Sequence, residues 1–398
     1  MNYAVNGMWP SPFNSTGRPT IDPDRKLLIA DCTLRDGEQQ AGVAFDSQAK
    51  VEIARALDKI GIYEIEAGTV ASSDEDRQAI VEMCRIGLRA KISVLCRGLE
   101  GDIDLAQKLG VWGVRLSFPV SEIERKHKLK GISDDDYIKR ALELTEYAAS
   151  RGLYVVFSPY DTTRADIKLL LRLVAEFSKT KTVHRLRIVD TTGCALPAAI
   201  STIVGEVRRA APEIPVEIHC HNDFGLACAN TLAGVEAGAD YISSTVNGLG
   251  ERCGNAANEE VIMALEVLYG YRTGINLAAL TELSQLVRRY SRIDYPVNKA
   301  VVGENAFRHE AGMVVAGVLK DPFTAEAYAP EIVGQKRQIL IGKKSGLVSV
   351  AFKVGQLGLD VDESVFPRIL ETVKSEAARM GRALTDDEFR VVATASLP

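Results

Sequence analysis

Short apolar runs rich in β-branched residues recur along the first two thirds of the chain, and each is followed by a longer stretch with helical periodicity. The runs predict eight strands, at Leu27–Asp31, Tyr63–Ala67, Lys91–Cys96, Gly113–Ser117, Tyr154–Ser158, Arg185–Asp190, Glu217–His221 and Tyr241–Asn247. The stretches between them predict helices, among them Ser47–Ile60, Asp74–Ile86, Asp134–Ser150, Ala165–Phe177, Pro197–Ala211 and Ala227–Ala237. Eight strand–helix units over about 250 residues are typical of an α/β fold of the (β/α)₈ TIM-barrel type, whereas a doubly wound sheet more often stops near about six strands.

The alternation of strands and helices stops after residue 272. Apolar periodicity then predicts a helix at Ala278–Ser291 and a connector at Pro296–Gly303, followed by short pieces separated by proline and glycine and by further amphipathic stretches. We therefore expect an N-terminal extension at 1–25, a catalytic TIM barrel at 26–272 and a mostly helical C-terminal lid or linker subdomain at 273–398. We expect that subdomain to pack on or over the mouth of the barrel.

The composition is that of a globular chain. Of its 398 residues 46% are hydrophobic and 25% charged, which excludes collagen, a long coiled coil and wholesale disorder. A net charge of -5 does not favour nucleic acid as a partner. There is no apolar run of the roughly 18–20 residues that a membrane helix needs, so no membrane partner is expected. Seven cysteines, an odd number without a CxxC motif, favour the reducing cytoplasm.

Polar motifs follow several of the predicted strands. TIM-barrel enzymes place their chemistry at the C-terminal ends of the strands. In this chain the first, second, sixth, seventh and eighth strands run into Asp31-Cys-Thr-Leu-Arg35-Asp36-Gly-Glu38-Gln39, Glu64-Ile-Glu66-Ala-Gly68, Asp190-Thr-Thr-Gly193, His219-Cys-His221-Asn222-Asp223 and Asn247-Gly-Leu-Gly-Glu251-Arg-Cys-Gly-Asn255. The barrel mouth is therefore the expected site.

Two histidines on the seventh strand are candidate metal ligands. His219 and His221 are two residues apart, so their side chains point to the same face of the strand. With Asp36 they would form a two-histidine, one-carboxylate set, which suits Zn²⁺, Mn²⁺, Fe²⁺ or Co²⁺, and further oxygen ligands would shift the preference toward Mg²⁺ or Mn²⁺. The alternative is two ordinary histidines paired with Asp223 or Glu217. The position at strand ends favours the metal.

Arg35 and Asn255 are candidate substrate-binding residues. The planar fork of Arg35 suits a small carboxylate, and the alternative is an internal ion pair with Glu38 or Glu66. Arg35 can form this ion pair and still bind a substrate carboxylate. Asn255 follows a glycine-rich loop, and it either reaches a metal or substrate oxygen or simply caps the loop.

Three motifs together resemble those of the 2-isopropylmalate, homocitrate and citramalate synthases of the DRE-TIM metallolyase superfamily, namely Asp31-x-Thr-Leu-Arg35-Asp36-Gly-Glu38-Gln39, His219-x-His221-Asn222-Asp223 and Asn247-Gly-x-Gly-Glu251-Arg-x-Gly-Asn255. The resemblance extends from about residue 26 to residue 350 and looks closest to homocitrate synthases of the nitrogen-fixation type. It implies a metal-dependent Claisen-type condensation of an acyl-CoA, usually acetyl-CoA, with a 2-oxo acid. Hydrolysis of the thioester would then release CoA and a 2-hydroxy di- or tricarboxylic acid.

The same resemblance implies roles for individual residues. Arg35 would stabilise the alkoxide that forms, and the 2-oxo acid would be read by side chains at the mouth. The expected substrate-binding residues are Arg35, Gln39, Glu66, Arg97, Ser117 and Thr191. A divalent ion (Mg²⁺, Mn²⁺, Co²⁺ or Zn²⁺) would be held by Asp36, His219, His221 and Asn255. The partners would be the 2-oxo acid, the acyl-CoA and a second copy of the chain, whose barrel mouth the C-terminal region covers.

The chain departs from this family at three positions. The fifth strand ends Ser158-Pro-Tyr160-Asp161, where the family carries glutamate at the third position. In His309-Glu-Ala-Gly312-Met-Val314 a valine replaces the second histidine of the family motif, and Ala325 stands where a tyrosine is common. A valine cannot exchange a proton, so acid–base work falls to Tyr160, His309 or Tyr328, or is lost. The expected catalytic residues are Arg35, Tyr160 and His309.

Three functions follow from this combination. The leading hypothesis is the condensation, with an altered substrate as one form of it. The second is a metal-dependent aldolase or retro-Claisen lyase that cleaves a C–C bond of a hydroxy diacid. The third is a catalytically silent relative that binds a 2-oxo acid or a metal without turnover.

Overall fold

The computed structural model describes residues 6–15, 21–22 and 24–396. Its contacts divide the chain into two compact units, one of residues 13–295 and one of residues 1–12 and 296–398. Parts of the expected N-terminal extension, residues 1–5, 16–20 and 23, lie outside the described residues.

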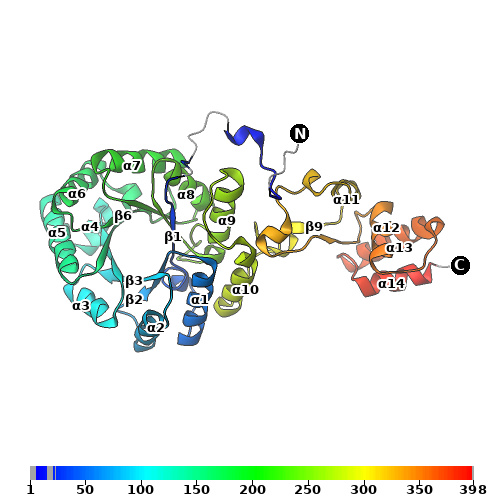
Figure 1. The fold of residues 1–398 in the computed structure, drawn as a ribbon, viewed down its shortest axis with the longest axis horizontal. Helices are drawn as coiled ribbons and strands as arrows, with labels where there is room; N and C mark the ends of the chain where they lie inside the picture. The colour runs from blue at the N-terminus through cyan, green and yellow to red at the C-terminus, as the bar shows by residue number, and fades with distance from the viewer. Residues whose placement is uncertain (1–5, 16–20, 23, 397–398) are drawn as a thin grey trace. The chain divides into compact units, whose positions relative to one another are not determined.

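Eight parallel strands form a closed barrel in the unit of residues 13–295 (Figure 1). They are β1 (Leu28–Asp31), β2 (Glu64–Thr69), β3 (Lys91–Arg97), β4 (Gly113–Pro119), β5 (Tyr154–Tyr160), β6 (Arg185–Asp190), β7 (Val216–Cys220) and β8 (Tyr241–Ser244). Each strand pairs with the next along the chain, and β8 closes the barrel against β1. The predicted (β/α)₈ fold is confirmed.

Helices surround the barrel strands in an outer ring (Figure 1). They are α1 (Ser47–Ile60), α2 (Asp74–Arg85), α3 (Glu100–Leu109), α4 (Glu122–Lys128), α5 (Asp134–Ser150), α6 (Ile167–Thr180), α7 (Pro197–Ala210) and α8 (Ala227–Glu236), followed by α9 (Asn258–Met263), a π-helical turn (Ala264–Leu268) and α10 (Leu280–Ser291).

The eighth strand ends earlier than the sequence predicted. Val246–Gly248 is a 3₁₀ turn in which Asn247 takes a left-handed conformation with φ of 62°, which a strand cannot continue.

The helix ends follow from local sequence signals. Side chains of Asp46, Ser73 and Ser133 accept backbone N–H groups at the N-termini of α1, α2 and α5. Gly61 and Gly110 end α1 and α3 in the left-handed conformation, which glycine adopts without strain. Each helix therefore stops where the chain must return to the barrel.

Six charged side chains fill the middle of the barrel instead of an apolar core. All are at most 2% exposed, and they are Glu64 and Glu66 of β2, Arg115 of β4, Arg185 and Arg187 of β6 and Glu217 of β7. We call them the barrel ion network. The Arg115 and Arg185 guanidinium groups each contact Glu64 and Glu217, within 2.5–2.8 Å. Burial would raise the pKa of Glu217, but the three arginines lower it to about 2. Three positive charges thus face three negative charges, and the network is neutral.

Aromatic rings cover the N-terminal end of this network. Trp112 and Tyr154, which lie just before or at the start of their strands, stack with ring centroids 4.1 Å apart. The Arg185 guanidinium carbon lies 3.7 Å from the ring centroid of Tyr241, the first residue of β8. Cation–π contacts of this kind are favourable when water is excluded. The N-terminal end of the barrel is therefore packed.

The second unit is mostly helical, as predicted. Its elements are β9 (Arg308–His309), α11 (Gly312–Val318), β10 (Gln338–Ile339), α12 (Leu347–Gln356), α13 (Phe366–Met380) and α14 (Asp386–Ala395), with short 3₁₀ turns between them. Helices α12 to α14 share a core that includes Val350, Ile369 and Phe389. The backbone N–H of Trp9 donates to Ala327, so residues of the N-terminal segment pack within this unit.

Helix α10 belongs to the barrel unit, and the division between the units falls after Tyr295. The expected domain boundary at residue 272 and the lid role of residues 273–398 stay predictions. Among the described residues, no helix combines the length and the apolar character that crossing a membrane requires.

Loss of one charge from the barrel ion network should destabilise the fold strongly. Arg115→Met leaves three buried carboxylates facing two arginines, and we expect it to lower the free energy of unfolding by roughly 3–5 kcal/mol. The measurement is the midpoint of urea unfolding. Arg209→Met removes only an exposed pair with Glu206 and should leave the midpoint unchanged. Equal shifts in the two variants would contradict the prediction.

Candidate active site

The C-terminal ends of the barrel strands surround a cavity of about 610 Å³. Nine of the residues predicted from the sequence line it, namely Arg35, Asp36, Gln39, Arg97, Ser117, Tyr160, Thr191, His219 and His221. Glu66 and Asn255 do not line the cavity but contact residues that do. His309 belongs to the other unit.

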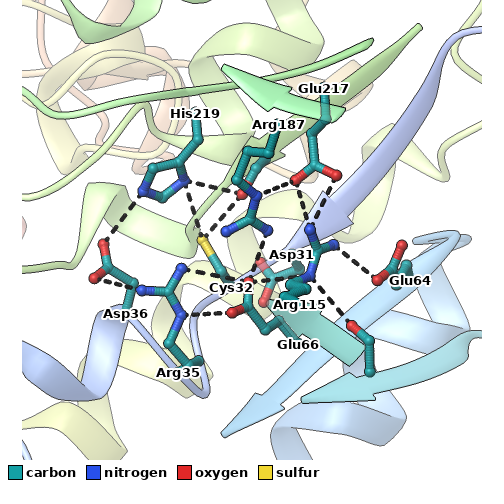
Figure 2. Close-up of polar contacts among 12 residues, drawn as sticks. Asp31, Cys32, Arg35, Asp36, Glu64, Glu66, Arg115, Arg187, Glu217 and His219 are labelled. Carbon is teal, nitrogen blue, oxygen red and sulfur yellow. Dashed lines mark hydrogen bonds and ion pairs between the residues drawn. The ribbon is translucent and has the colours of Figure 1, made fainter. Parts of the chain in front are cut away.

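Asp36, His219 and His221 face one another at one side of the cavity. A tight turn follows β1, in which the backbone N–H groups of Arg35 and Asp36 both donate to the Cys32 carbonyl oxygen. This turn presents the Asp36 carboxylate to β7. The Nε2 atoms of His219 and His221 each lie 3.8 Å from Asp36 Oδ2, and all three side chains are buried (Figure 2 shows His219 and Asp36).

The chemistry of these three side chains fits a divalent metal ion. Their ligand atoms all lie within 4.8 Å of one another. An ion about 2.1 Å from each ligand atom holds neighbouring ligand atoms roughly 3.0–3.4 Å apart, so only a small inward shift is needed. Burial lowers the pKa of both His219 and His221, which keeps the imidazoles neutral, as metal ligands must be. Nδ1 of His219 lies 3.0 Å from Ser243 Oγ, which leaves Nε2 directed at Asp36.

Asn255 lies against Asp36. Its Nδ2 group donates to Asp36 Oδ2 and, at 3.0 Å, to the Leu249 carbonyl oxygen, so it both contacts the acidic residue and caps its own loop. Its Oδ1 is buried and has no hydrogen-bond partner among the described residues. Gly250 permits this approach, because a Cβ there would lie 2.1 Å from Asn255 Nδ2. A buried amide oxygen next to Asp36 is consistent with a further oxygen ligand.

Arg35 is a buried cation at the cavity wall. Its Nε donates to Glu66 Oε1 at 2.7 Å and its Nη1 to Asp36 Oδ1 at 3.0 Å (Figure 2). Burial alone would lower the pKa of Arg35, but the Glu66 and Asp36 carboxylates raise it above its usual value. The internal ion pair with Glu66 that the sequence left open is present, and Arg35 still lines the cavity.

Glu38, the other suggested partner of Arg35, has a different contact. It pairs with Lys50 of α1 at 2.7 Å and accepts the backbone N–H of Phe45. Lys50 is only 1% exposed and also contacts Asp76 of α2. This shared ammonium ties the loop that carries Arg35 to the helical ring.

Arg187 is a cavity residue that the sequence reasoning missed. Its guanidinium binds Glu217 Oε1 at 2.7 Å and Glu66 Oε2 at 2.8 Å, and it lies beside His219 (Figure 2). The sequence did contain a signal for this position. Arg185 and Arg187 are two residues apart on the sixth strand, so their side chains point to the same face of it. Arg187 therefore connects the barrel ion network to the site.

Arg252 is a second missed residue. It lines the cavity, and its guanidinium donates to Asp223 Oδ1 at 2.8 Å and to the Thr191 carbonyl oxygen at 2.6 Å. It thus joins the loops that follow β6, β7 and β8. Thr191 in turn accepts the Asp161 backbone N–H on its hydroxyl, at 2.7 Å.

Tyr160 ends β5 and lines the cavity beside Lys128, the last residue of α4. The Lys128 ammonium nitrogen lies 4.9 Å from the ring centroid of Tyr160. Burial raises the pKa of the Tyr160 phenol by more than the nearby ammonium lowers it. The phenol is therefore protonated at neutral pH, and its hydrogen-bond partners are the Lys128 ammonium and the Glu124 carboxylate.

His309 has its own partners within the second unit. Its Nε2 lies 3.0 Å from Glu326 Oε1, and Arg337 binds the same carboxylate at 2.6 and 2.7 Å. Burial raises the pKa of Tyr328 to about 12. Acid–base roles for His309 or Tyr328 stay predictions.

Comparison with family models and known proteins gives consistent matches. The HMGL-like family model matches residues 26–287, and a model described as homocitrate synthase post-HMGL domain-like matches residues 301–381. Homocitrate synthase AksA of Methanopyrus kandleri is 43% identical over 382 residues, which cover 96% of this chain and 95% of that protein. 2-Isopropylmalate synthase of Methanocaldococcus jannaschii is 40% identical over 93% of this chain and 71% of that protein. (R)-citramalate synthase CimA of the same organism is 40% identical over 92% and 74%.

Solved structures share the fold. Hydroxymethylglutaryl-CoA lyase from Pseudomonas aeruginosa has a TM-score of 0.62 at 21% identity, covering 70% of this chain and 97% of that one. The carboxyl transferase domain of Rhizobium etli pyruvate carboxylase has a TM-score of 0.56 at 18% identity, covering 71% and 51%. These likenesses concern the barrel architecture alone. The extent and identity of the sequence matches, in contrast, place the chain in the HMGL-like family, and within it the chain belongs to the homocitrate, 2-isopropylmalate and citramalate synthases.

Proposed function

We propose that the protein condenses an acyl-CoA, acetyl-CoA in the first instance, with the ketone carbon of a 2-oxo acid. Hydrolysis of the thioester then releases CoA and a 2-hydroxy di- or tricarboxylic acid. The named relatives are synthases, which supports an acyltransferase of this condensing kind. The observation that carries the proposal is the meeting of Asp36, His219, His221 and Arg35 at one cavity.

Asp36, His219 and His221 would hold a divalent ion such as Mg²⁺, Mn²⁺, Co²⁺ or Zn²⁺, with Asn255 as a fourth candidate ligand. When bound, such an ion supplies Lewis acidity toward a ketone or carboxylate oxygen. Neighbouring residues would hold these ligand side chains in place. Ser243 orients the His219 ring, and Arg35 binds one oxygen of Asp36 at 3.0 Å. Partners of this kind fix the ligands before the ion arrives.

Arg35 would stabilise the negative charge that develops on the ketone oxygen. Its guanidinium is already held by Glu66, so no reorganisation is needed during the reaction. Arg187 adds a second fixed cation behind it. Glu66, which the sequence predicted to bind substrate, would act through these two arginines, because it contacts both and does not line the cavity.

The remaining wall would bind the 2-oxo acid. We assign contact with this substrate to Gln39, Arg97, Ser117 and Thr191, which line the same cavity as Asp36 and His219. They come from four separate strand ends. Their hydrogen-bonding groups would orient the acid before the new bond forms.

We further propose that the protein works in the cytoplasm as a homodimer. All seven cysteines are free thiols, as a reducing compartment would keep them. Met313 is 91% exposed on the second unit, and Val314, Leu347 and Val348 are at least 40% exposed, which is consistent with cover by another chain.

Free thiol should appear when the purified protein meets acetyl-CoA, a 2-oxo acid and Mg²⁺, Mn²⁺ or Co²⁺. A colorimetric thiol assay over a panel of 2-oxo acids measures this release. Omission of the 2-oxo acid is the control for simple thioester hydrolysis. Silence across the whole panel would count against the condensation.

Removal of a ligand should weaken metal binding directly. We expect Asp36→Asn and His219→Gln each to lower the affinity for Mn²⁺ by about 100-fold, because loss of a group that only orients a metal ligand already costs about 10–100-fold. Titration calorimetry with Mn²⁺ measures the affinity without any substrate. His127→Gln is the matched control, since His127 is exposed on α4. An unchanged affinity in the Asp36 variant would refute the assignment.

The protonated phenol of Tyr160, with Val314 and Ala325 in the second unit, favours a metal-dependent aldolase or retro-Claisen lyase as a second candidate. Such an enzyme would release a 2-oxo acid from a hydroxy diacid without CoA. The double variant Tyr160→Glu/Val314→His separates the two functions. If it gains acetyl-CoA condensation that the unmodified chain lacks, Tyr160 and Val314 are what redirected the chemistry, and release of a 2-oxo acid from a hydroxy diacid without CoA then identifies the lyase. If the unmodified chain already condenses, the lyase is excluded as its main activity.

A further inference from the structure

Arg252 has a backbone conformation that is unusual for its residue type. It lies in the loop between β8 and α9, and its φ of 58° is in the left-handed region. A residue with a Cβ is strained there, and glycine or asparagine is the usual occupant. Strained residues concentrate at functional sites, and Arg252 lines the cavity.

The Arg252 side chain connects its own loop to the two loops before it. Its Nε and Nη2 donate to the two carboxylate oxygens of Asp223 at 2.8 and 3.0 Å, the paired geometry that a guanidinium makes with a carboxylate. The same Nη2 donates to the Thr191 carbonyl oxygen at 2.6 Å. Asp223 follows β7 and Thr191 follows β6, so one side chain holds both neighbouring loops. We call these three residues the Arg252 bridge.

Backbone hydrogen bonds hold these loops near the candidate metal ligands. The Asn222 N–H donates to the Gly254 carbonyl oxygen at 2.9 Å, and the His221 N–H donates to the Asp190 carbonyl oxygen at 3.2 Å. The hydrogen bond that connects Thr191 to the β8 loop comes from the Arg252 side chain. Loss of this side chain therefore affects Thr191 more than it affects His221.

The Thr191 hydroxyl is oriented by a second contact. The backbone N–H of Asp161 donates to Thr191 Oγ1 at 2.7 Å. Because the oxygen accepts this bond, the single hydroxyl proton is directed away from Asp161 and remains available for an oxygen of a bound acid. Thr191 lines the cavity. Arg252 thus holds its carbonyl group and Asp161 its hydroxyl group, and both are fixed before an acid binds.

We propose that Arg252 is a positioning residue, which fixes Thr191 and through it the bound 2-oxo acid, without contacting the acid itself. This inference rests on the proposed function, which assigns contact with the acid to Thr191. The donors of one edge of the guanidinium are already used by Asp223 and by the Thr191 carbonyl. Arginine suits this position because its planar fork binds a carboxylate and a carbonyl at once, whereas the ammonium of lysine is a point charge.

Binding of a 2-oxo acid tests the Arg252 bridge without turnover. The Mn²⁺-loaded protein is titrated calorimetrically with pyruvate, 2-oxobutanoate, 2-oxopentanoate and 2-oxoglutarate, and the tightest binder is used for the variants. Arg252→Asn removes the bridge and keeps a residue that tolerates the left-handed backbone. We expect it to weaken acid binding by about 10-fold, because the lost hydrogen bonds involve charged groups, and to leave the affinity for Mn²⁺ unchanged.

Further single variants check both sides of the bridge. Arg252→Lys should weaken acid binding by only about 2–5-fold, since an ammonium retains one of the two contacts. Asp223→Asn removes the partner's charge and should reproduce much of the loss. Arg208→Gln is the matched control, because Arg208 also connects an aspartate, Asp240, to a backbone carbonyl, that of Ile214, and does not line the cavity. It should change neither affinity.

A double variant shows whether Arg252 acts through Thr191. Thr191→Val removes the hydroxyl, keeps the shape of the side chain and should itself weaken acid binding by about 10-fold. If Arg252 acts by placing that hydroxyl, Arg252→Asn/Thr191→Val should bind the acid as weakly as Thr191→Val alone. Additive losses would show that Arg252 contacts the acid directly and would overturn the proposal.

Other outcomes separate this inference from the proposed function. In turnover, Arg252→Asn should raise KM for the acid and leave kcat nearly unchanged. An equal loss of Mn²⁺ affinity, a large fall in the urea midpoint, unchanged acid binding or no binding of any acid in the panel would each overturn the positioning role. The expected binding changes without thiol release would refute the condensation and leave the bridge standing. Thiol release with an unaltered KM in Arg252→Asn would do the reverse.

Discussion

The barrel ion network is the constraint on which the rest of the structure depends. Arg115, Arg185 and Arg187 occupy the space where an apolar core would otherwise hold the strands together, and Glu64 and Glu217 bridge between them. A buried charge without a partner costs several kcal/mol, so each of these residues is tolerable only while the others are in place. The closure of β2, β4, β6 and β7 into one barrel is therefore coupled to complete charge pairing.

The candidate active site adjoins this network at the C-terminal ends of the strands. Glu66 binds Arg187 within the barrel and Arg35 at the cavity, and Arg35 in turn holds Asp36 beside His219 (Figure 2). The orientation of the candidate ligands is thus set by ion pairs that water does not reach. Electrostatic stabilisation of a developing oxyanion is strongest in a site of this kind, because the charges are fixed before the reaction begins.

Tyr160 and Lys128 line another part of the cavity, and they are held by different contacts. Tyr160 is half-buried and Lys128 is exposed, and both hydrogen-bond with Glu124 of α4 rather than with the barrel ion network. Asp36, His219 and His221 face one another at the cavity, and Tyr160 lies where the fifth strand ends. Membership in the homocitrate, 2-isopropylmalate and citramalate synthases sets the reaction class.

The sequence by itself determined the barrel and the position of its site. Periodicity of apolar residues defined eight strand–helix units, and parallel strands must bring the motifs at Asp36 and His219 to the same end of the barrel. Only the tertiary structure decided which charges pair: Arg187 with Glu66, and Glu38 with Lys50 rather than with Arg35. The physical reason is that such contacts depend on strand register and barrel closure between segments far apart in the chain, and neither can be read from local patterns.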